Sequence, residues 1–215
     1  MRRPVDSYGG FPYCTDQSKN ATVKDMARPR TFEEGQAVEA AMRAFWESGY
    51  EATSTQDLCT ATGLGRSSIY NAFEGKRELF DKALRRYMAQ KDAELAELLE
   101  SGLPVREKVR ALLWYAVDSP ESDPPGCFVT NTLVELGTRD PELAGPARRH
   151  QEERVARLRD AFAAARAQGE LAPDRDPDAL AHFLMATIGG MRVAARGGAD
   201  RAALEAIART ALQAF

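Results

Sequence analysis

The chain has 215 residues, of which 44% are hydrophobic and 28% charged, and a formal net charge of -3, which predicts an ordinary globular protein of one or two domains. No apolar run approaches the roughly 20 residues of a membrane span, and the start of the chain lacks the apolar core of a signal peptide. The cysteines are widely spaced and the two histidines lack ligand spacing, which excludes a disulfide framework and a metal motif. We therefore expect a cytoplasmic protein without metal, cofactor or membrane contact.

Residues 1–26 differ in composition from the rest of the chain. They mix Pro, Gly, Ser, Asn and Thr without the period of a helix or a strand. This composition predicts a disordered N-terminal extension. The alternative is an over-called start, in which case Met26 is the natural first residue.

Residues 32–50 predict an amphipathic helix. The apolar residues recur at intervals of three and four, which is the period of a helix that buries one face. They are Val38, Ala41, Met42, Phe45 and Trp46. We expect this helix to brace the motif that follows it.

Residues 54–65 have the pattern of a short capped helix and a turn. Ser54 and Asp57 have the spacing of a capping box at the start of a helix, and Gly63 ends that helix. Gly65 leaves the backbone free to turn sharply. A second short helix is expected directly after this turn.

Residues 66–73 form that second predicted helix. Ile69 and Phe73 lie four residues apart and face inward together. The outward side chains are short or planar enough to touch phosphates and base edges in a major groove. They are Arg66, Ser67, Ser68, Tyr70 and Asn71. The two helices therefore predict a helix-turn-helix that reads DNA, although the net charge gives no bulk sign of nucleic-acid binding.

Together with their flanks, these residues resemble the TetR family of bacterial one-component transcription regulators. The matching residues are Arg28, Arg30, 41–50 (AMRAFWESGY), Thr53, Ser54, Gly63, 69–73 (IYNAF) and 76–80 (KRELF). The resemblance covers roughly residues 28–88 and is architectural beyond them. It implies an all-α fold with an N-terminal three-helix helix-turn-helix domain and a C-terminal antiparallel helical domain for ligand binding and dimerisation.

The predicted division is an extension at 1–26, a helix-turn-helix domain at 27–76, and an effector-binding and dimerisation domain at 77–215 that begins with the connecting helix. Helical periods and breakers predict the helices of this last domain. The first ends near Ser101, and the next three run from Pro104 to about Ala116, from Cys127 to Thr138, and from Asp140 to about Gln168. A loop from Ser119 to Gly126 separates the second from the third.

The last two predicted helices, Pro177 to Arg196 and Arg201 to Ala214, flank a glycine break. The first of them has a broad apolar face with Gly189 and Gly190 in its middle, which lets another helix approach closely. The resemblance implies that this pair packs against its two-fold mate as a four-helix bundle, and a homodimer can read a palindromic operator. The alternative is a glycine pair that loosens an intramolecular helix.

The DNA contact is assigned to the second short helix and its surroundings. The assigned residues are Arg30, Thr53, Ser54, Arg66, Ser67, Ser68, Tyr70, Asn71 and Lys76. The helix start and Asn71 are assigned to base edges, Tyr70 and Lys76 to phosphates, and Thr53 and Ser54 to phosphates through backbone N–H groups. Arg30 reaches a phosphate or the minor groove. For each residue the alternative is a solvated surface side chain. The N-terminal extension has a DNA-contacting alternative as well, through Arg2, Arg3, Lys19 and Lys24.

The resemblance also implies a small-molecule effector pocket in the helices between Pro104 and Met191. The effector must bind one separation of the two heads better than the other, with a coupling of about 1–3 kcal/mol. The candidates are Trp114, Tyr115, Cys127, Phe128, Asn131, Phe162, His182, Phe183 and Met185. Each of the aromatic and Met residues equally fits a core position, and His150 is expected on a solvated helix face among Arg148, Arg149 and Glu152.

Cys127 follows Pro-Pro-Gly at the predicted start of a helix, where the helix dipole lowers the pKa of a thiol. Residues 126–136 (GCFVTNTLVEL) also resemble a branch of the family in which some members respond to electrophiles or oxidants. One hypothesis is that modification of Cys127 releases DNA. The alternative is an inert, half-buried cysteine.

No sequence motif supports an enzyme. The chain has no Gly-x-Ser-x-Gly and no phosphate-binding Gly-Lys-Thr, and Gly63-Leu64-Gly65 follows a helix where a dinucleotide site needs a strand. The sequence therefore predicts a DNA-binding regulator, with repression as the usual habit of the family. The alternative is a helical protein-interaction module that does not bind DNA.

Overall fold

The computed structural model describes residues 30–118, 120 and 123–215, and for residues 30–33 it describes the backbone alone. In this part of the chain every regular element is a helix, so the all-α prediction is confirmed. The helices are α1 Arg30–Ser48, α2 Thr55–Thr62, α3 Arg66–Phe73, α4 Lys76–Glu100, α5 Val105–Val117, α6 Phe128–Leu136, α7 Gly145–Ala167, α8 Pro177–Arg196 and α9 Arg201–Ala211, with a 3-10 turn at Leu212–Ala214.

Some predictions fall outside the described residues. These are the N-terminal extension at 1–26, the basic residue Arg28, and positions 119, 121 and 122 of the predicted loop. Among the helices that are described, none combines the length and the apolar character that a bilayer crossing requires.

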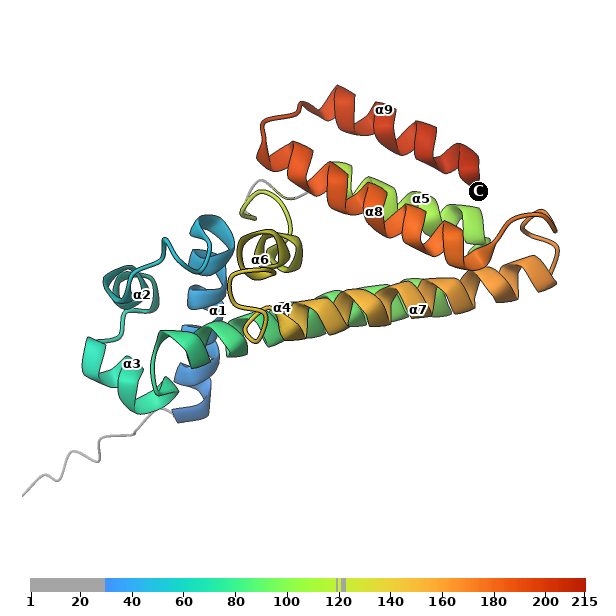
Figure 1. The fold of residues 1–215 in the computed structure, drawn as a ribbon. Helices are drawn as coiled ribbons and strands as arrows, with labels where there is room; N and C mark the ends of the chain where they lie inside the picture. Colours follow the sequence, from blue (N-terminus) through green and yellow to red (C-terminus); the bar gives the residue numbers. More distant parts are fainter. Residues whose placement is uncertain (1–29, 119, 121–122) are drawn as a thin grey trace, which may run out of the picture.

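The helices form a small head and an elongated body (Figure 1). Helices α1, α2 and α3 make up the head, and α4 leaves the head to run beside α7 along the body. Helices α5, α8 and α9 pack together at the far side of the body. Helix α6 lies between the head and this group, and it contacts α1, α4, α7 and α8.

The predicted capping box at α2 is confirmed. The Ser54 hydroxyl accepts a hydrogen bond from the Asp57 amide at 3.1 Å, and the Asp57 carboxylate accepts one from the Ser54 amide at 2.8 Å. Gly63 ends the helix in the left-handed conformation, with φ of 69°, which glycine adopts without strain. These local interactions fix where the turn before α3 begins.

The hydrophobic core of the head extends beyond α1–α3. Phe45 of α1 packs edge-on against Phe80 of α4, with ring centroids 5.1 Å apart. Phe128, the first residue of α6, packs against Phe80 at 5.5 Å and against Tyr87 at 5.8 Å. The head therefore shares one core with the first half of α4, with α6 and with the start of α7.

A second core holds the far end of the body together. It contains the buried residues of α5, α8 and α9, and those of α7 beyond its middle, with Leu95 of α4. Helix α4 contributes to both cores, since its buried residues from Leu79 to Met88 belong to the first. The predicted domain boundary between residues 76 and 77 falls at the start of α4 and remains a proposal.

The predicted start of α7 is wrong. Residues 141–144 form turns, and the helix begins at Gly145 rather than directly after Asp140. The reason is that Asp140 caps a turn: its carboxylate accepts a hydrogen bond from the Leu143 amide at 2.9 Å, and its carbonyl accepts one from Ala144 at 3.0 Å. The third predicted helix is shorter than expected, because Cys127 is the residue before α6 and the helix ends at Leu136.

The inward and outward residues of α3 give a stability test. Phe73 is fully buried, whereas Tyr70 on the same helix is 47% exposed. We expect Phe73→Ala to lower the free energy of unfolding by about 3–5 kcal/mol, because it removes a buried ring and leaves a cavity. Tyr70→Ala is the matched control and should change it by about 0.5 kcal/mol or less. Chemical denaturation followed by circular dichroism measures both, and equal losses would contradict the inward packing of Phe73.

Candidate DNA-binding surface and internal cavity

Helix α3 presents a polar face to solvent. Ile69 and Phe73 are buried beneath it, as predicted, and the five residues predicted to face outward are all exposed. These are Arg66, Ser67, Ser68, Tyr70 and Asn71. The Tyr70 ring lies next to Gly75, since a Cβ built on this glycine would be 3.5 Å from it. The face thus combines a guanidinium, two hydroxymethyl groups, a phenol and an amide on one short helix.

The start of α2 is less open than predicted. Thr53 is buried, and its hydroxyl donates to the Gly49 carbonyl at 2.6 Å, so any outside contact of Thr53 is left to its backbone. The Ser54 amide already donates to Asp57. Hydrogen bonds from the Ser54 hydroxyl and amide lower the pKa of the Asp57 carboxyl. The amides of Thr55 and Gln56, in the first turn after Ser54, have no carbonyl partner within the helix, because they precede its first i to i−4 hydrogen bond.

Lys76 lies at the start of α4, beside the turn between α1 and α2. Its ammonium group stands 4.4 Å from the centre of the Tyr50 ring and 3.5 Å from the Glu51 carbonyl oxygen. These contacts hold a cation at the edge of the head. Arg30 is the first residue of α1, and its side chain lies outside the described part of the chain.

Helix α6 is hydrogen-bonded to the head through one carboxylate. Glu135 accepts hydrogen bonds from the Tyr50 amide at 2.9 Å and the Glu51 amide at 2.8 Å. Gly49 has a φ of 85°, which favours glycine, and a Cβ added there would come within 2.7 Å of the same carboxylate and force it to shift. This contact was not predicted from the sequence, because its partners are 85 positions apart and carry no local signal.

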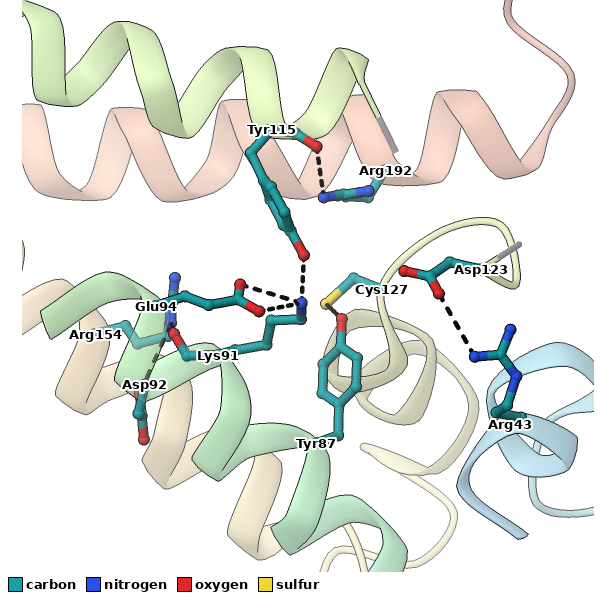
Figure 2. Close-up of polar contacts among 10 residues, drawn as sticks. All are labelled: Arg43, Tyr87, Lys91, Asp92, Glu94, Tyr115, Asp123, Cys127, Arg154 and Arg192. Atoms are coloured by element: carbon teal, nitrogen blue, oxygen red, sulfur yellow. Dashed lines mark hydrogen bonds and ion pairs between the residues drawn. The ribbon is translucent and has the colours of Figure 1, made fainter. Parts of the chain in front are cut away.

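An ion pair ties the start of α4, next to the head, to the segment before α7. Arg77 of α4 contacts Asp140 at 2.5 Å and Glu142 at 3.0 Å, both in the segment before α7. The hydrogen bond from Arg77 lowers the pKa of Asp140, and the same bond raises the pKa of Arg77. A separate ion pair links the head to the segment before α6: Arg43 of α1 lies 3.6 Å from Asp123 (Figure 2).

A cavity of about 310 Å³ lies between the two hydrophobic cores. Its walls come from α4, α5, α6, α7 and α8. Apolar groups such as Leu95, Leu112 and Ile188 line part of it. The remainder of the wall is polar, and Figure 2 shows several of these side chains converging from different helices.

One polar group of the wall is centred on Lys91 of α4. Its ammonium group donates to the Glu94 carboxylate at 2.9 and 3.1 Å and to the Tyr115 hydroxyl (Figure 2). Burial alone would lower the pKa of Lys91, but its hydrogen bonds to Tyr115 and Glu94 outweigh this effect and raise it. Arg192 of α8 donates to the Tyr115 carbonyl at 3.0 Å and lies over the Tyr115 ring.

Cys127 precedes α6 and lines the same cavity. It is half-buried, and the Tyr87 hydroxyl donates to its sulfur at 3.6 Å (Figure 2). Burial raises the pKa of Tyr87 well above its usual value, which keeps the phenol protonated and able to donate. The thiol is therefore held at the N-terminal end of a helix and open to the cavity.

A third polar group contains His150 of α7, which the sequence led us to expect on a solvated face. This prediction is wrong, because His150 is 6% exposed and faces α4, where its Nε2 lies 3.2 Å from Asp92 Oδ1. Arg154, one turn further along α7, donates to the Lys91 carbonyl at 2.8 Å. Both His150 and Arg154 line the cavity, and Asp92 stands behind them.

Of the nine residues predicted as candidates for the effector pocket, Tyr115, Cys127 and Met185 lie in the wall of this cavity. The other six are Trp114, Phe128, Asn131, Phe162, His182 and Phe183. Phe128 belongs to the first core and Phe162 to the second, where it packs against Phe215. Asn131 donates to the Trp46 carbonyl.

Three of these six lie on or near the surface. The His182 side chain is 66% exposed and Phe183 is 42% exposed, both on α8. Trp114 is partly buried against the second core, beneath Arg110. Helical spacing identified apolar faces but could not distinguish a cavity wall from a core or an outer surface. Within the residues described, no three His, Cys, Asp or Glu side chains are grouped to hold a metal ion.

Two families match the chain by sequence. Residues 37–83 match the family described as bacterial regulatory proteins, tetR family, and residues 105–211 match the tetracyclin repressor-like C-terminal domain. Over 203 residues the chain is 32% identical to the HTH-type transcriptional repressor ComR of Escherichia coli K12, and the aligned region covers 91% of this chain and 95% of that protein. It is 36% identical over 167 residues to the uncharacterized HTH-type transcriptional regulator YezE of Bacillus subtilis 168, covering 74% of this chain and 84% of that one.

The fold also matches solved structures. One is a cysteine-substituted form of the TetR family transcriptional regulator CifR in complex with a 26-base-pair double-strand operator DNA. It superposes with a TM-score of 0.78 at 32% sequence identity, covering 87% of this chain and 99% of that chain. Sequence and structure comparisons thus agree over both the head and the body.

The ion pair between Arg77 and Asp140 gives a pH test. A carboxylate whose pKa is lowered in the folded state stabilises the protein above its ordinary pKa, here 3.8, and this contribution is lost as pH falls through the lowered value. We therefore expect Asp140→Asn to lower the thermal unfolding midpoint at pH 7, and the difference from the parent protein to shrink as pH falls below 3.8. Glu142→Gln is the control, because the Glu142 side chain is 90% exposed and should contribute little at any pH. A difference that stays constant into acid would contradict the assignment.

Proposed function

Because the chain belongs to the TetR family of bacterial regulatory proteins, a class of DNA-binding transcriptional regulators, we propose that it is a cytoplasmic repressor that binds a palindromic operator as a homodimer and leaves it when an effector binds. The observation that carries the proposal is the polar, exposed face of α3 above buried Ile69 and Phe73. A short helix that is anchored by its apolar side and exposed on its polar side fits a major groove.

Each exposed group on the head has a contact that suits its chemistry. Arg66 at the start of α3 can pair with the acceptor edge of guanine, and Asn71 can pair with adenine. The Tyr70 hydroxyl and the Lys76 ammonium group suit phosphate oxygens. Ser67 and Ser68 are short enough to let the helix approach the bases. Ser54 opens α2, whose first-turn amides and positive helix end favour a phosphate.

The body supplies the proposed dimer interface. Large apolar side chains remain exposed on its last two helices: Phe183 at 42% and Val193 at 51% on α8, and Ile207 at 39% on α9. Gly189 lines the cavity, but Gly190 is exposed, and a Cβ added to it would meet no atom within 4 Å, so this chain itself does not fill the space beside Gly190. A second copy packed on α8 and α9 would cover these groups, and a symmetric pair of heads would then match a palindromic operator.

The cavity between the two cores is the proposed effector site. Its wall contains the first turns of α6, and the last turn of the same helix carries Glu135, which binds the head. A ligand that shifts α6 therefore acts directly on the segment before α2. Because Phe128 packs in the core of the head, such a shift also changes how the head packs on α4. The ligand needs a preference of only about 1–3 kcal/mol for the released arrangement.

Cys127 offers a second route into the same helix. A bulky adduct on its sulfur would occupy the cavity, displace the Tyr87 hydroxyl and push on the start of α6. We include release of the operator by thiol modification in the proposed function for this reason.

DNA binding is tested first with a duplex selected from a random pool. We expect an inverted repeat whose affinity falls steeply with salt, because phosphate contacts release counterions. Arg66→Ala and Tyr70→Ala should each weaken binding by about tenfold, and Lys76→Ala should in addition reduce the salt slope by about one. Fluorescence anisotropy of the labelled duplex measures these affinities.

The control for these variants is Arg159→Ala, which removes an exposed cation from the second half of α7, a helix of the body (Figure 1). It should leave operator affinity unchanged within about twofold. If the pool contains no duplex that the protein retains at low salt, the protein is a helical interaction module rather than a repressor.

Release of the operator by thiol modification is tested with N-ethylmaleimide. The S–H group of a cysteine adds across the carbon–carbon double bond of this reagent, so no leaving group is formed. We expect treatment to release the operator from the parent protein and from Cys59→Ser, but not from Cys127→Ser. Cys59 is the matched control, because it is also a free, half-buried cysteine but lies on α2. Equal release from both serine variants would end the hypothesis for Cys127, and mass spectrometry of the modified protein identifies the alkylated residue.

A further inference from the structure

The side of the cavity formed by α4 and α7 contains a buried histidine without a full set of hydrogen bonds. His150 is 6% exposed, and its Nδ1 has no hydrogen-bond partner among the described residues. Its Nε2 lies 3.2 Å from Asp92 Oδ1, but not in hydrogen-bond geometry. An unpaired polar group buried in this way destabilises the protein, and a ligand in the cavity that accepts a hydrogen bond from it can offset this cost.

Arg154 lies one helical turn from His150 on the same face of α7. Its side chain is 16% exposed. Among the described residues, the guanidinium is contacted through Nη1, which lies 2.8 Å from the Lys91 carbonyl oxygen and 3.7 Å from Asp92 Oδ1. Burial lowers the pKa of Arg154, which means that the charged guanidinium is held in a poorly solvated place. Its remaining donors suit an anion in the cavity, because a guanidinium fork matches a carboxylate.

The charges around this wall do not balance. The Asp92 carboxylate is shared by His150, Arg154 and Arg157, at distances of 3.2, 3.7 and 3.7 Å. The nearby Lys91 is paired separately with Glu94. Burial lowers the pKa of His150, so its imidazole is uncharged in the empty cavity. One carboxylate therefore serves two guanidiniums, and the excess positive charge of this wall comes from the arginines.

The rest of the cavity is suited to an apolar body. Leu95, Leu112 and Ile188 line it, with Met185 from α8. A volume of about 310 Å³ accommodates a small organic molecule rather than an inorganic ion alone. The ligand therefore needs an anionic end and a hydrocarbon remainder.

We propose that the effector is a small organic carboxylate, held with its carboxylate between Arg154 and His150 and its hydrocarbon part against the leucines and Ile188; this rests on the proposed function, which makes the cavity the effector site. The carboxylate accepts hydrogen bonds from the Arg154 guanidinium and from His150 Nδ1. Asp92 near Nε2 and a bound carboxylate near Nδ1 both raise the pKa of His150 against the lowering effect of its burial, so binding favours the protonated imidazole. The ligand in turn balances the excess charge of the wall.

The experiment compares acids with uncharged amides of the same carbon skeleton. The probes are 3-phenylpropanoate and octanoate, with 3-phenylpropanamide and octanamide, titrated calorimetrically into the full-length protein without DNA. None of the four reacts readily with a thiol, so their binding is independent of any chemistry at Cys127. We expect at least one acid to bind about tenfold or more tightly than its amide, which corresponds to one charge-assisted hydrogen bond.

Three variants identify the site. His150→Leu and Arg154→Leu should each weaken the acid by about tenfold or more and leave the amide unaffected, while Arg154→Lys retains the charge and restores part of the affinity. Arg157→Leu is the matched control, because Arg157 contacts the same Asp92 but is 44% exposed and does not line the cavity. It should change acid binding by about twofold or less. Helical circular dichroism of each variant establishes that it is folded.

The outcomes separate this proposal from the one on which it rests. If neither acid binds, or if the amides bind as tightly as the acids, the carboxylate site is wrong, even when the protein binds its operator. If the acids bind with the expected dependence on His150 and Arg154 but no duplex is retained, the carboxylate site stands and the proposed repressor function fails. Acid binding that lowers operator affinity in the same preparation supports both.

Discussion

The position of the head depends on the packing of α6 into it. Phe128, at one end of this helix, belongs to the aromatic cluster of Phe80 and Tyr87. At the other end, the Glu135 carboxylate accepts hydrogen bonds from two backbone amides in the turn between α1 and α2. Charge-assisted hydrogen bonds to backbone amides are stronger than neutral ones and are sensitive to angle. The head therefore cannot rotate on α4 without either moving α6 or losing these contacts.

This constraint explains why the cavity can matter to a surface at the other end of the head. The cavity wall includes the first turns of α6, so a molecule inside it contacts a rigid helix rather than a loop. Closely packed interiors transmit small displacements instead of absorbing them. The Arg77 ion pair with Asp140 ties α4 to the segment before α7, so the path from cavity to head runs through packed elements on two sides. Coupling in this arrangement is a property of the shared core.

Local patterns in the sequence were enough to predict the head. The capping box of Ser54 and Asp57, the helix end at Gly63 and the burial of Ile69 and Phe73 each depend on residues three to nine positions apart, and the structure agrees on all of them. Helical periods and breakers located the helices of the body, and the resemblance to a known family implied how they assemble. The placement of Cys127 at the start of α6 also followed from its immediate neighbours.

The cavity could not be predicted in the same way, because its wall is assembled from five helices. His150 has polar neighbours in sequence, but the rotation of α7 against α4 turns it inward towards Asp92. Phe128 and Phe162 fit an aromatic pocket by composition, yet each fills a core. Asp140 looked like a helix cap and instead caps a turn, since helix and turn use the same carboxylate-to-amide bond. The missing information in each case is the packing of distant segments.

The polar groups in the cavity wall are costly to bury, and this cost indicates that the wall serves ligand binding rather than stability. Burying Arg154, His150 and Asp92 costs desolvation energy that their mutual attraction only partly offsets. A core made for stability alone would fill this space with apolar side chains, as both neighbouring cores do. A wall that retains unmet hydrogen bonds and excess charge is instead less stable when empty than when it holds a complementary molecule. Binding can use this difference in free energy to move α6. The polar wall therefore lowers the stability of the fold between the two cores and, for the same reason, lets the body change when a ligand binds.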